Sequence, residues 1–402
     1  MPKNLSAETI AIVSATVPAL QENGLAIVHE MYARMFRNPE IRDLFNQSNH
    51  GVSDAQPRAL TGAILAYAAN IENLGALAPA VERIAQKHVG LQILPEHYPH
   101  VAEALLEAIK QVLGEAATSA VLTAWGEAYW FLADILIARE KRIYTEQVDA
   151  TGGWNGWRDF RIAEVIPESS VITSFILKPV DGGPVMRHRP GQYLSFSFEI
   201  PGEAPAKRNY SISSAPNGES YRISVKAEPL GLASRWLHAQ PVGTVLKVAA
   251  PAGEFHLDRL PERPVVLLSG GVGLTPMVAM LEWLVEQGTN QPVHYIHGTH
   301  DRNTHAMRNH VRQLAARAET VRITDFHQTP LAGEVAGQDY DLSGLITDEW
   351  LLANSSPAMS DYYICGPRPF LRAAVAALSL AGVPSDRIHY EFFGPADEML
   401  AA

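Results

Sequence analysis

The side chain with the clearest chemical potential in this chain is His88, which ends an apolar stripe on a predicted helix. The stripe consists of Val81, Ile84, Ala85 and His88. These positions follow the spacing i, i+3, i+4 and i+7, so one helical face carries apolar side chains and then an imidazole. Such an imidazole is either a core histidine with a hydrogen-bond partner or a ligand to something buried. Taken alone, this helix favours the core histidine.

A glycine-rich run between two apolar segments is a second place where chemistry is expected. Residues 270–277 read Gly-Gly-Val-Gly-Leu-Thr-Pro-Met, directly after an apolar, strand-like run at 265–268. An apolar helical stretch follows, and strand, loop and helix in this order are the setting of a dinucleotide-binding loop. The run departs from G-x-G-x-x-G at its last position, where Pro276 stands. Because proline suits the first turn of a helix, the loop still presents a helix N-terminus to phosphate.

Two shorter motifs contain groups that can bind phosphate. The first consists of Arg208, Asn209, Tyr210 and Ser211. It follows a strand-like segment, and its arginine and hydroxyls could hold a pyrophosphate and the edge of a flat ring. For four residues alone, however, an exposed turn is the favoured interpretation. The second consists of Gly231, Leu232, Ala233 and Ser234, which open an amphipathic segment and offer backbone N–H groups to a phosphate.

A third short motif ends another apolar run. It consists of Cys365, Gly366 and Pro367. The run before it reads as a strand, so the motif falls at the carboxyl edge, where open α/β sheets bind ligands. The alternative for Cys365 is a small buried residue.

The elements that must position these residues fall into three regions. We expect an all-α domain over 1–149, an antiparallel β-barrel over 150–261 and a parallel α/β domain over 262–402. Helical spacing with proline breaks dominates the first region, and short alternating strands separated by glycine turns dominate the second. Strand and helix alternate in the third. A glycine- and tryptophan-rich connector at 151–157 separates the first two.

Composition excludes several classes of function. The chain has 402 residues and a formal net charge of −11, which argues against nucleic acid or an anionic membrane as its partner. Its only cysteine is Cys365, so intramolecular disulfides and thiolate clusters are impossible. We expect no export signal, because Ser6 reads as a helix N-cap, and no transmembrane segment, because glycines and Pro276 interrupt the uncharged stretch 264–281. A cytoplasmic enzyme is predicted.

The order of the motifs after residue 155 resembles the ferredoxin–NADP reductase superfamily. The resemblance implies that Arg208, Tyr210 and Ser211 contact FAD, with Asn209 between them, and that residues 231–234 meet its pyrophosphate. Further residues that the resemblance assigns to the flavin or the nicotinamide nucleotide are Tyr193, Gly271, Gly273, Thr275, Pro276, Cys365, Gly366, Pro367, Glu391, Phe392 and Phe393. Phe393 is expected where nicotinamide must stack on the flavin.

A reductase with a helical domain attached raises the question of what accepts its electrons. The helical region has five histidines and no cysteine, which excludes an iron–sulfur cluster held by thiolates. A haem needs only one imidazole, and His88 has the right helical phase.

The helical region resembles the globin part of the flavohaemoglobins, and with it the resemblance covers nearly the whole chain. It implies that His88 is the proximal haem ligand and that Tyr98 and Glu140 are its proximal partners. The distal pocket would contain Tyr32, Gln56 and Leu60, and Phe45 and Lys87 would border the haem. Two residues depart from the family pattern: Pro57, which could displace the start of the distal helix, and Phe392, where relatives often carry a smaller residue.

The resemblance implies a nitric oxide dioxygenase. NAD(P)H would reduce FAD, FAD would reduce haem b, and the oxygen-bound ferrous haem would oxidise NO to nitrate. Glu140 would bond the free ring N–H of His88, and Tyr32 would donate to the bound oxygen. The alternatives are a haem-based oxygen or NO sensor or store with an attached reductase, and a general NAD(P)H-dependent haem or flavin reductase. A monomer is expected, with an apolar or lipid guest in the haem pocket. The choice between NADH and NADPH stays open, because the acid Asp301 and the bases Arg302 and Arg308 indicate different coenzymes.

Overall fold

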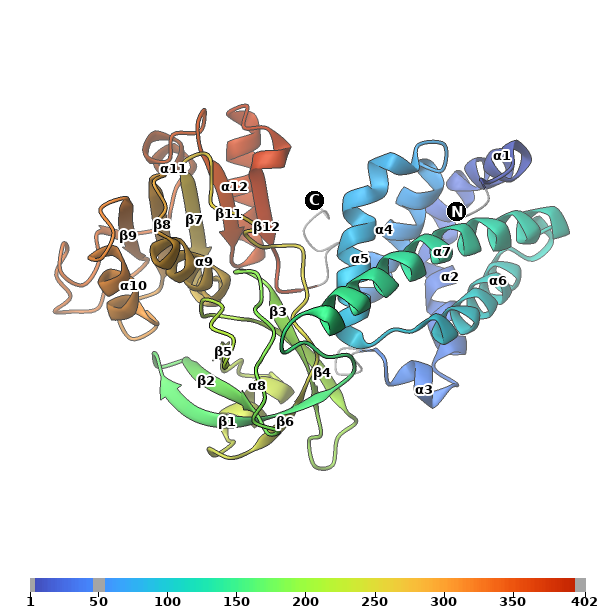
Figure 1. Ribbon diagram of the computed structural model, residues 1–402. Helices are drawn as coiled ribbons and strands as arrows, with labels where there is room; N and C mark the ends of the chain where they lie inside the picture. The colour runs from blue at the N-terminus through green and yellow to red at the C-terminus, as the bar shows by residue number, and fades with distance from the viewer. Residues whose placement is uncertain (1–3, 46–54, 395–402) are drawn as a thin grey trace. The chain divides into compact units, whose positions relative to one another are not determined.

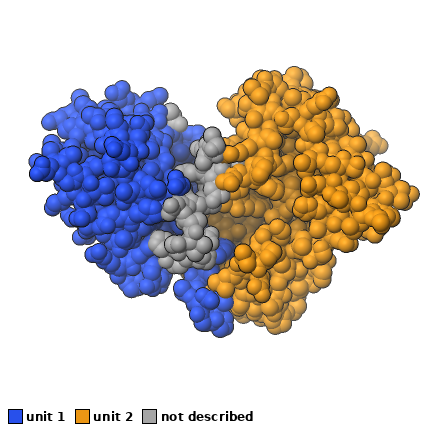
Figure 2. Space-filling model, turned by 180° about the vertical axis from the view of Figure 1, so that it is seen from behind, with its two compact units in different colours: residues 1–149, 199–208, 395–401 blue, residues 150–198, 209–394, 402 orange. Residues whose placement is uncertain are grey.

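The computed structural model describes residues 4–45 and 55–394, which form two compact units. The first contains 1–149 with 199–208 and 395–401, and the second contains 150–198, 209–394 and 402 (Figure 2).

Helices make up most of the first unit (Figure 1). They are α1 (Ala7–Ala15), α2 (Val17–Met35), α3 (Pro39–Arg42), α4 (Ala55–Ala69), α5 (Ala78–Leu91), α6 (Tyr98–Leu113) and α7 (Ser119–Asp149). Short 3-10 turns precede or follow some of them: η2 (Leu74–Leu77), η3 (Pro95–His97) and η4 (Gly114–Ala116). The all-α expectation for this region is confirmed.

Local sequence explains where several of these helices begin. The Ser6 hydroxyl accepts a hydrogen bond from the backbone N–H of Thr9, which confirms the predicted N-cap of α1. Asn38 caps α3 in the same way, and Pro39 and Pro79 stand in the first turns of α3 and α5. The proline breaks read from the sequence are therefore helix starts.

The core of the helical unit lies between α2, α4, α6 and α7. Its buried side chains include Ile27, Met31 and Tyr32 from α2, Ile109 from α6 and Trp125 from α7. A second apolar cluster joins α5 to α7 through residues such as Ala85, Val89, Ala133 and Leu136. Packing against α7 thus holds the helix that carries His88.

Length and composition alone would allow α7 to cross a membrane, and α1 with α2, bent by 68° between them, would count as a second span if taken together. This is weak evidence, because core helices of soluble proteins meet the same test. Within the helical unit, α7 buries Trp125, Ala128 and Glu140.

An antiparallel sheet begins the second unit. Its strands are β1 (Arg158–Pro167), β2 (Ile172–Pro179), β3 (Tyr193–Phe198), β4 (Ala206–Ser211), β5 (Tyr221–Lys226) and β6 (Val245–Val248), in the order β4-β3-β6-β1-β2-β5, with helix α8 (Leu232–His238) between β5 and β6. An isolated bridge from Ile212 to Ile223 connects the end of β4 to β5. The antiparallel domain is confirmed, although its barrel is not fully closed by strand pairing. The sequence placed residues 208–211 after a strand, whereas they lie within β4 itself.

A six-stranded parallel sheet forms the rest of the second unit. Its strands are β7 (Val265–Gly270), β8 (Val293–Thr299), β9 (Val321–His327), β10 (Leu342–Ser343), β11 (Asp361–Cys365) and β12 (Ile388–Glu391), in the order β10-β9-β8-β7-β11-β12. The intervening helices are α9 (Leu274–Gln287), α10 (Arg308–Ala315), α11 (Asp348–Asn354) and α12 (Arg368–Leu380), with 3-10 turns η5 (Gly271–Gly273) and η6 (Ser385–Arg387). The strand order reverses between β7 and β11, and ligands bind outside the carboxyl ends of strands at such a switch point.

Candidate functional site

His88 belongs to a triangle of hydrogen-bonding groups on α5, α6 and α7. Its Nδ1 lies 2.7 Å from Oε1 of Glu140 and 3.1 Å from the hydroxyl of Tyr98. The Tyr98 hydroxyl in turn donates to the same Glu140 oxygen at 2.6 Å. The expected contact between His88 and Glu140 is therefore present, and Tyr98 shares the carboxylate with the imidazole.

Contacts between α5 and α7 fix this triangle. The guanidinium of Arg139 donates to both carboxylate oxygens of Glu82, at 2.6 and 2.9 Å. Gln86 donates to Glu82 from one turn further along α5. Because Arg139 directly precedes Glu140, this bidentate pair sets the rotation of α7 that brings the Glu140 carboxylate to His88.

Burial determines the protonation of the tyrosine in the triangle. Burial and the neighbouring Glu140 carboxylate raise the pKa of Tyr98 well above its ordinary value, so its hydroxyl keeps its proton and remains a donor. Glu140 is only 2% exposed, and its Oε2 has no hydrogen-bond partner among the residues that the structure describes. The charge on this carboxylate is therefore shared by the two donors at Oε1.

The donor set fits a haem better than a metal ion held by protein side chains alone. Within residues 4–45 and 55–394, no group of three or more His, Cys, Asp or Glu side chains is arranged to hold a metal. A haem iron requires only an axial ligand from the protein. Both hydrogen bonds of His88 in the described structure use Nδ1, so Nε2 is the nitrogen left to bind iron.

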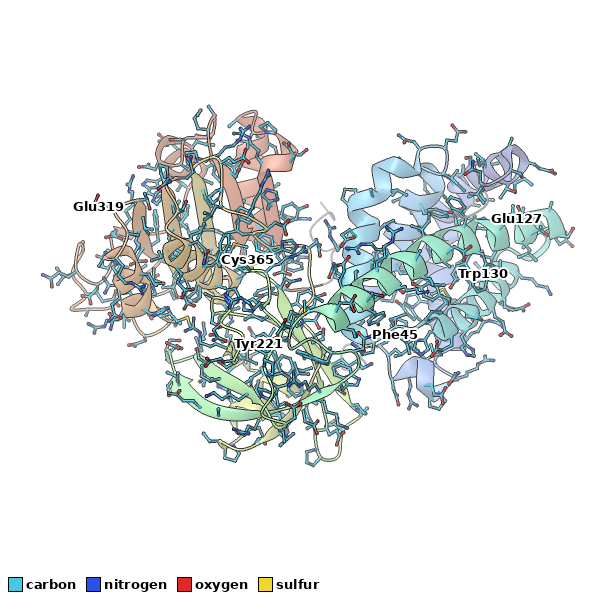
Figure 3. All side chains as sticks on the ribbon, in the orientation of Figure 1. Phe45, Glu127, Trp130, Tyr221, Glu319 and Cys365 are labelled. Atoms are coloured by element: carbon cyan, nitrogen blue, oxygen red, sulfur yellow. The ribbon has the colours of Figure 1, made fainter. Side chains whose placement is uncertain are left out.

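The residues predicted for the distal side gather on α2 and α4. Tyr32 is 4% exposed, stacks on Phe36 with ring centres 5.2 Å apart, and meets the edge of Phe45 at 5.7 Å. Phe45, which Figure 3 labels, and Leu60 are partly buried against the same core. Burial raises the pKa of Tyr32 well above its ordinary value, so it too remains a donor.

The proline beside the predicted distal glutamine does not break its helix. Because α4 begins at Ala55, Pro57 stands in the first turn, where its missing N–H has no partner to lose. Gln56 is half-buried on this turn, and the Pro57 carbonyl accepts a hydrogen bond from Thr61. Lys87, which was expected to border the haem, is exposed on α5.

Two of the residues predicted to bind the flavin have buried hydroxyls without a partner among the described residues. The Tyr193 hydroxyl and the Ser211 hydroxyl are buried, and neither has a hydrogen-bond partner among the described residues. A backbone bond of 2.9 Å from Ile212 to the Gln192 carbonyl brings the end of β4 beside the start of β3. The Tyr193 ring packs on Gly253, where an added Cβ would lie 2.9 Å from the ring. Unsatisfied buried hydroxyls usually signal an unseen partner, and a flavin with a polar edge fits this role.

The other predicted flavin residues have more ordinary surroundings. Arg208 donates to the Lys207 carbonyl at 2.7 Å, Asn209 is exposed, and the Tyr210 ring leans on Phe196. In the 231–234 loop, the Ser234 hydroxyl accepts from Glu228 N and donates to the Gly231 carbonyl, which shapes the start of α8. Leu232 is half-buried and Ala233 is buried in the same turn.

The glycine-rich loop packs backbone to backbone on the Cys365 motif. A Cβ at Gly273 would lie 2.2 Å from the Cys365 carbonyl oxygen and 2.7 Å from the Gly366 nitrogen. A Cβ at Gly270 would lie 3.1 Å from the Pro367 ring, and Gly271 has a left-handed φ of +54°. Two loops thus meet at the switch point between β7 and β11, where the sequence predicted a nucleotide.

The remaining residues of this edge are buried to different degrees. Thr275 is 2% exposed and bonds the Val272 carbonyl, and Pro276 is buried in the first turn of α9. Cys365, labelled in Figure 3, is fully buried, and burial together with Glu391 raises the pKa of its thiol.

The segment after β12 ends at an exposed aromatic ring. Glu391 pairs with Cys365 in the sheet, Phe392 is half-buried and Phe393 is 47% exposed.

The acid and the two bases that follow β8 all contact polar or charged groups. Asp301 accepts from the backbone and hydroxyl of Thr304. Arg302 pairs with Asp339 at 3.5 Å, and the guanidinium of Arg308 lies 3.6 Å from Asp325.

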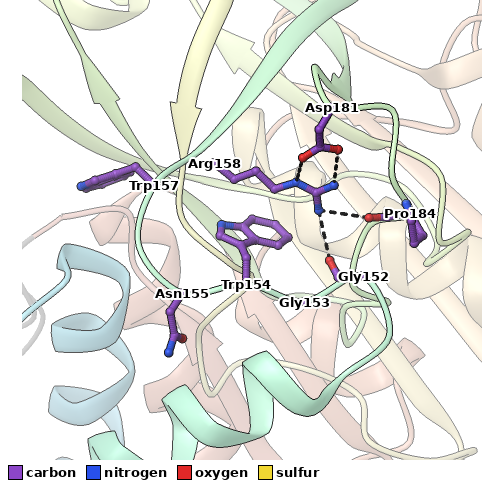
Figure 4. Close-up of a pocket in the computed structure, with 8 residues that line it drawn as sticks. All are labelled: Gly152, Gly153, Trp154, Asn155, Trp157, Arg158, Asp181 and Pro184. Atoms are coloured by element: carbon purple, nitrogen blue, oxygen red, sulfur yellow. Dashed lines mark hydrogen bonds and ion pairs between the residues drawn. The ribbon is translucent and has the colours of Figure 1, made fainter.

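Sequence reasoning missed an arginine that organises the connector between the units. Arg158 forms a bidentate pair with Asp181 and donates to the carbonyls of Gly152 and Pro184 (Figure 4). It also lies 5.3 Å from the centre of the Trp154 ring. A surface pocket of about 420 Å³ opens here, lined by Gly152, Gly153, Trp154, Asn155, Trp157, Arg158, Asp181 and Pro184. Only the glycines and tryptophans of the connector signalled a special segment.

Three family models match successive parts of the chain. They are a globin at 29–136, an oxidoreductase FAD-binding domain at 161–257 and an oxidoreductase NAD-binding domain at 267–376. The fold and sites therefore define a globin joined to a flavin- and nicotinamide-dependent oxidoreductase.

Full-length relatives narrow this class to one family. The chain is 52% identical to the flavohemoprotein of Xylella fastidiosa strain Temecula1, with all of both chains covered. It is 44% identical to the flavohemoprotein of Rhizobium meliloti, with 97% of this chain and 98% of the relative covered. The chain belongs to the flavohemoprotein family.

Solved structures agree with this assignment. A flavohemoglobin from Malassezia yamatoensis, solved with bound FAD and heme, matches with a TM-score of 0.88 and 25% identity, covering 98% of this chain and 100% of that one. The FAD/NAD-binding domain of a nitric oxide dioxygenase from Vibrio cholerae matches with a TM-score of 0.54 and 38% identity, covering 59% of this chain and 99% of that one.

Proposed function

We propose that this protein is a nitric oxide dioxygenase that uses NAD(P)H, FAD and haem b to convert NO and O₂ to nitrate. The observation that carries the proposal is the His88–Glu140–Tyr98 triangle, in a chain that also contains flavin- and nucleotide-binding domains. We further propose that the haem domain occupies 1–149, the FAD domain 150–261 and the NAD(P) domain 262–402.

When bound, NAD(P)H, FAD and the haem iron supply the electrons and the oxygen activation of this reaction. His88 would offer Nε2 to the iron, while Glu140 holds the proton on Nδ1. A hydrogen bond from Nδ1 to a carboxylate makes the imidazole a stronger electron donor, which favours oxygen chemistry over simple oxygen carriage.

Tyr32 is the proposed donor on the distal side. Its ring is held by Phe36 and Phe45, and its pKa is raised by burial, so its hydroxyl stays protonated where negative charge develops on oxygen. Leu60 would exclude water from this region, and Gln56 would stand at its edge.

The reductase residues would bind and orient rather than react. The unpartnered hydroxyls of Tyr193 and Ser211 would bond the polar edge of the flavin, with Arg208, Asn209, Tyr210 and the 231–234 turn around the rest of FAD. Gly271, Gly273 and Thr275 with the Cys365–Gly366–Pro367 turn would receive the nucleotide, and the exposed Phe393 ring would lie near the flavin, where nicotinamide must stack.

The cell compartment, the oligomeric state and the guest of the haem pocket are also proposals. We propose a cytoplasmic monomer whose haem pocket admits an apolar guest. A small apolar void of about 10 Å³ lies between α2, α4, α6 and α7, beside the distal residues, and includes Gly24, Thr61 and Trp125 in its wall. This volume is about that of one water-sized probe, which is far too small for a lipid chain.

The deciding experiment is NAD(P)H-driven consumption of NO by the purified protein, with nitrate measured as the product. The absorption spectrum should show a Soret band above flavin absorbance. NAD(P)H oxidation without NO consumption would instead indicate a general reductase, and slow flavin reduction with tight oxygen binding would indicate a sensor or store.

A further inference from the structure

A buried carboxylate joins the FAD and NAD(P) lobes of the second unit. Glu282 lies in the third turn of α9 and is 7% exposed. It accepts hydrogen bonds of 2.6 Å from the backbone N–H of Ala215 and from the guanidinium of Arg222, both in the FAD-binding lobe. The ring Nε2 of His310, on α10, also lies 2.6 Å from it. One side chain thus connects three segments that are distant in the sequence.

The partners of Glu282 are themselves held in place. Arg222, on β5, also donates to the carbonyl and the hydroxyl of Ser213, so its guanidinium bridges the 213–215 segment and α9. Burial alone would raise the pKa of Glu282, but the three donors outweigh it and hold the pKa below its ordinary value. The group is therefore a carboxylate anion at neutral pH, and its hydrogen bonds are charge-assisted.

The two ends of this connection lead to the two proposed cofactor sites. The 213–215 segment begins two residues after Ser211, whose unpartnered hydroxyl marks the flavin site. Helix α9 begins directly after Gly271–Gly273, the loop proposed to receive the nucleotide. Close packing also connects the two lobes here, because a Cβ at Gly191 would lie 2.5 Å from the Met280 side chain on α9.

We propose that Glu282 is a positioning residue for hydride transfer, which sets the approach of the nucleotide-binding helix to the flavin-binding strands. This inference rests on the proposed NAD(P)H-to-FAD reaction. Hydride transfer requires donor and acceptor atoms in near contact, and a displacement of about 1 Å costs roughly 100-fold in rate. Glu282 acts through protein groups, namely the Ala215 amide, Arg222 and His310, so its effect is on geometry.

The functional test uses Glu282→Gln in the full-length protein with haem and FAD bound. The amide keeps the size of the side chain but loses the charge and presents an NH₂ group toward one of its donors. In anaerobic stopped flow, the limiting rate of flavin reduction by NADH should fall by roughly 10- to 100-fold. The NADH concentration for half-maximal rate should change less than threefold, because the glycine loop is intact. Glu286→Gln, an exposed glutamate one turn later on α9, is the matched control and should behave as wild type.

A second measurement does not depend on the loaded enzyme. Because the Ala215 amide donates directly to the carboxylate, Glu282→Ala should speed hydrogen exchange at residues 213–215 by about tenfold in protein stripped of flavin, with exchange in α12 unchanged. Should Glu282→Gln fold poorly, Arg222→Lys keeps the charge but loses the planar guanidinium, and should lower the limiting rate in the same direction by a smaller factor.

The outcomes separate this inference from the proposed function. A limiting rate per bound FAD within twofold of wild type in Glu282→Gln, or a loss that appears only as reduced FAD content, would overturn the positioning role. If wild-type protein failed to reduce FAD with either NADH or NADPH, the proposed reductase function itself would fail.

Discussion

The Nδ1 atom of His88 lies 2.7 Å from Oε1 of Glu140, and that same oxygen accepts a 2.6 Å hydrogen bond from Tyr98. Two donors therefore compete for one carboxylate oxygen, while the other oxygen is buried without a partner among the described residues. The strength of the bond to His88 depends on how much of the carboxylate charge Tyr98 withdraws. Removing the charge of Glu140 and removing the hydroxyl of Tyr98 should therefore change the hydrogen bond to His88 in opposite directions.

Glu140→Gln should weaken the donor character of His88, because a neutral amide oxygen attracts the Nδ1 proton less than a carboxylate does. The iron–histidine stretching frequency of the ferrous, ligand-free protein should fall, and NO dioxygenation should drop by about tenfold. Resonance Raman spectroscopy and NO consumption measure the two effects. Tyr98→Phe is the matched comparison: with one donor removed, the carboxylate should pull harder on Nδ1 and raise the same frequency. Shifts of the same sign in both variants would contradict the competition.

Tyr32→Phe should remove one hydroxyl and leave the ring in place, because Phe36 and Phe45 hold it by aromatic contacts. Loss of a hydrogen bond to developing negative charge should raise the oxygen dissociation rate by roughly 10- to 100-fold. Haem content should stay at the wild-type level. Stopped-flow oxygen displacement by CO measures the rate, and an unchanged rate would exclude Tyr32 as the distal donor.

The sequence predicted individual elements better than the contacts between them. Periodicity located the face of α5 that carries His88, and strand–loop–helix order located the Gly271–Gly273 turn. The partners of His88, however, came from family resemblance, because Glu140 is 52 positions away and spacing carries no information across that separation.

Long-range ion pairs explain what the sequence left out. Arg158 binds Asp181 from 23 positions away, and Glu282 binds Arg222 from 60 positions away. Each of these residues looks like an ordinary charged surface residue in the sequence, and only the tertiary fold brings it to its partner. The sequence placed Ser211 after a strand, whereas the structure places it within β4. The reason is related, because pairing of β4 within the sheet overrides a local sequence that is typical of a turn.

Gly273→Ala should disrupt the contact between the nucleotide loop and the Cys365 motif. The added Cβ would lie 2.2 Å from a carbonyl oxygen, and backbone atoms cannot rotate away as a flexible side chain can. We expect a loss of unfolding free energy of about 1–3 kcal/mol in this unit and a reductase activity lowered by at least tenfold. Gly298→Ala, at the end of β8, is the control, because its nearest neighbour would lie at 3.4 Å. Equal effects of the two substitutions on NADH–ferricyanide reduction would rule out the close approach as the cause.

Acid should destabilise the second unit through its buried histidines, which include His188 and His297. Burial lowers the pKa of His188 and of His297 from 6.5 to about 4, so the folded unit holds both rings neutral. The unfolded chain takes up these protons below about pH 6.5, so stability is complete above that pH and is lost as the pH falls toward 4. For each of these histidines, the free energy of unfolding should fall by about 1.4 kcal/mol per pH unit in this window.

His297→Asn should remove one histidine's share of this pH dependence, because an amide does not titrate. Hydrogen exchange of core amides in β7 and β8 between pH 6.5 and 4.5 measures the opening free energy of this unit alone. The slope of that free energy with pH should fall by about 1.4 kcal/mol per unit in the variant. His300→Asn, at an exposed position just after β8, should leave the slope unchanged. An identical slope in wild type and His297→Asn would show that His297 does not contribute to the acid sensitivity of the second unit.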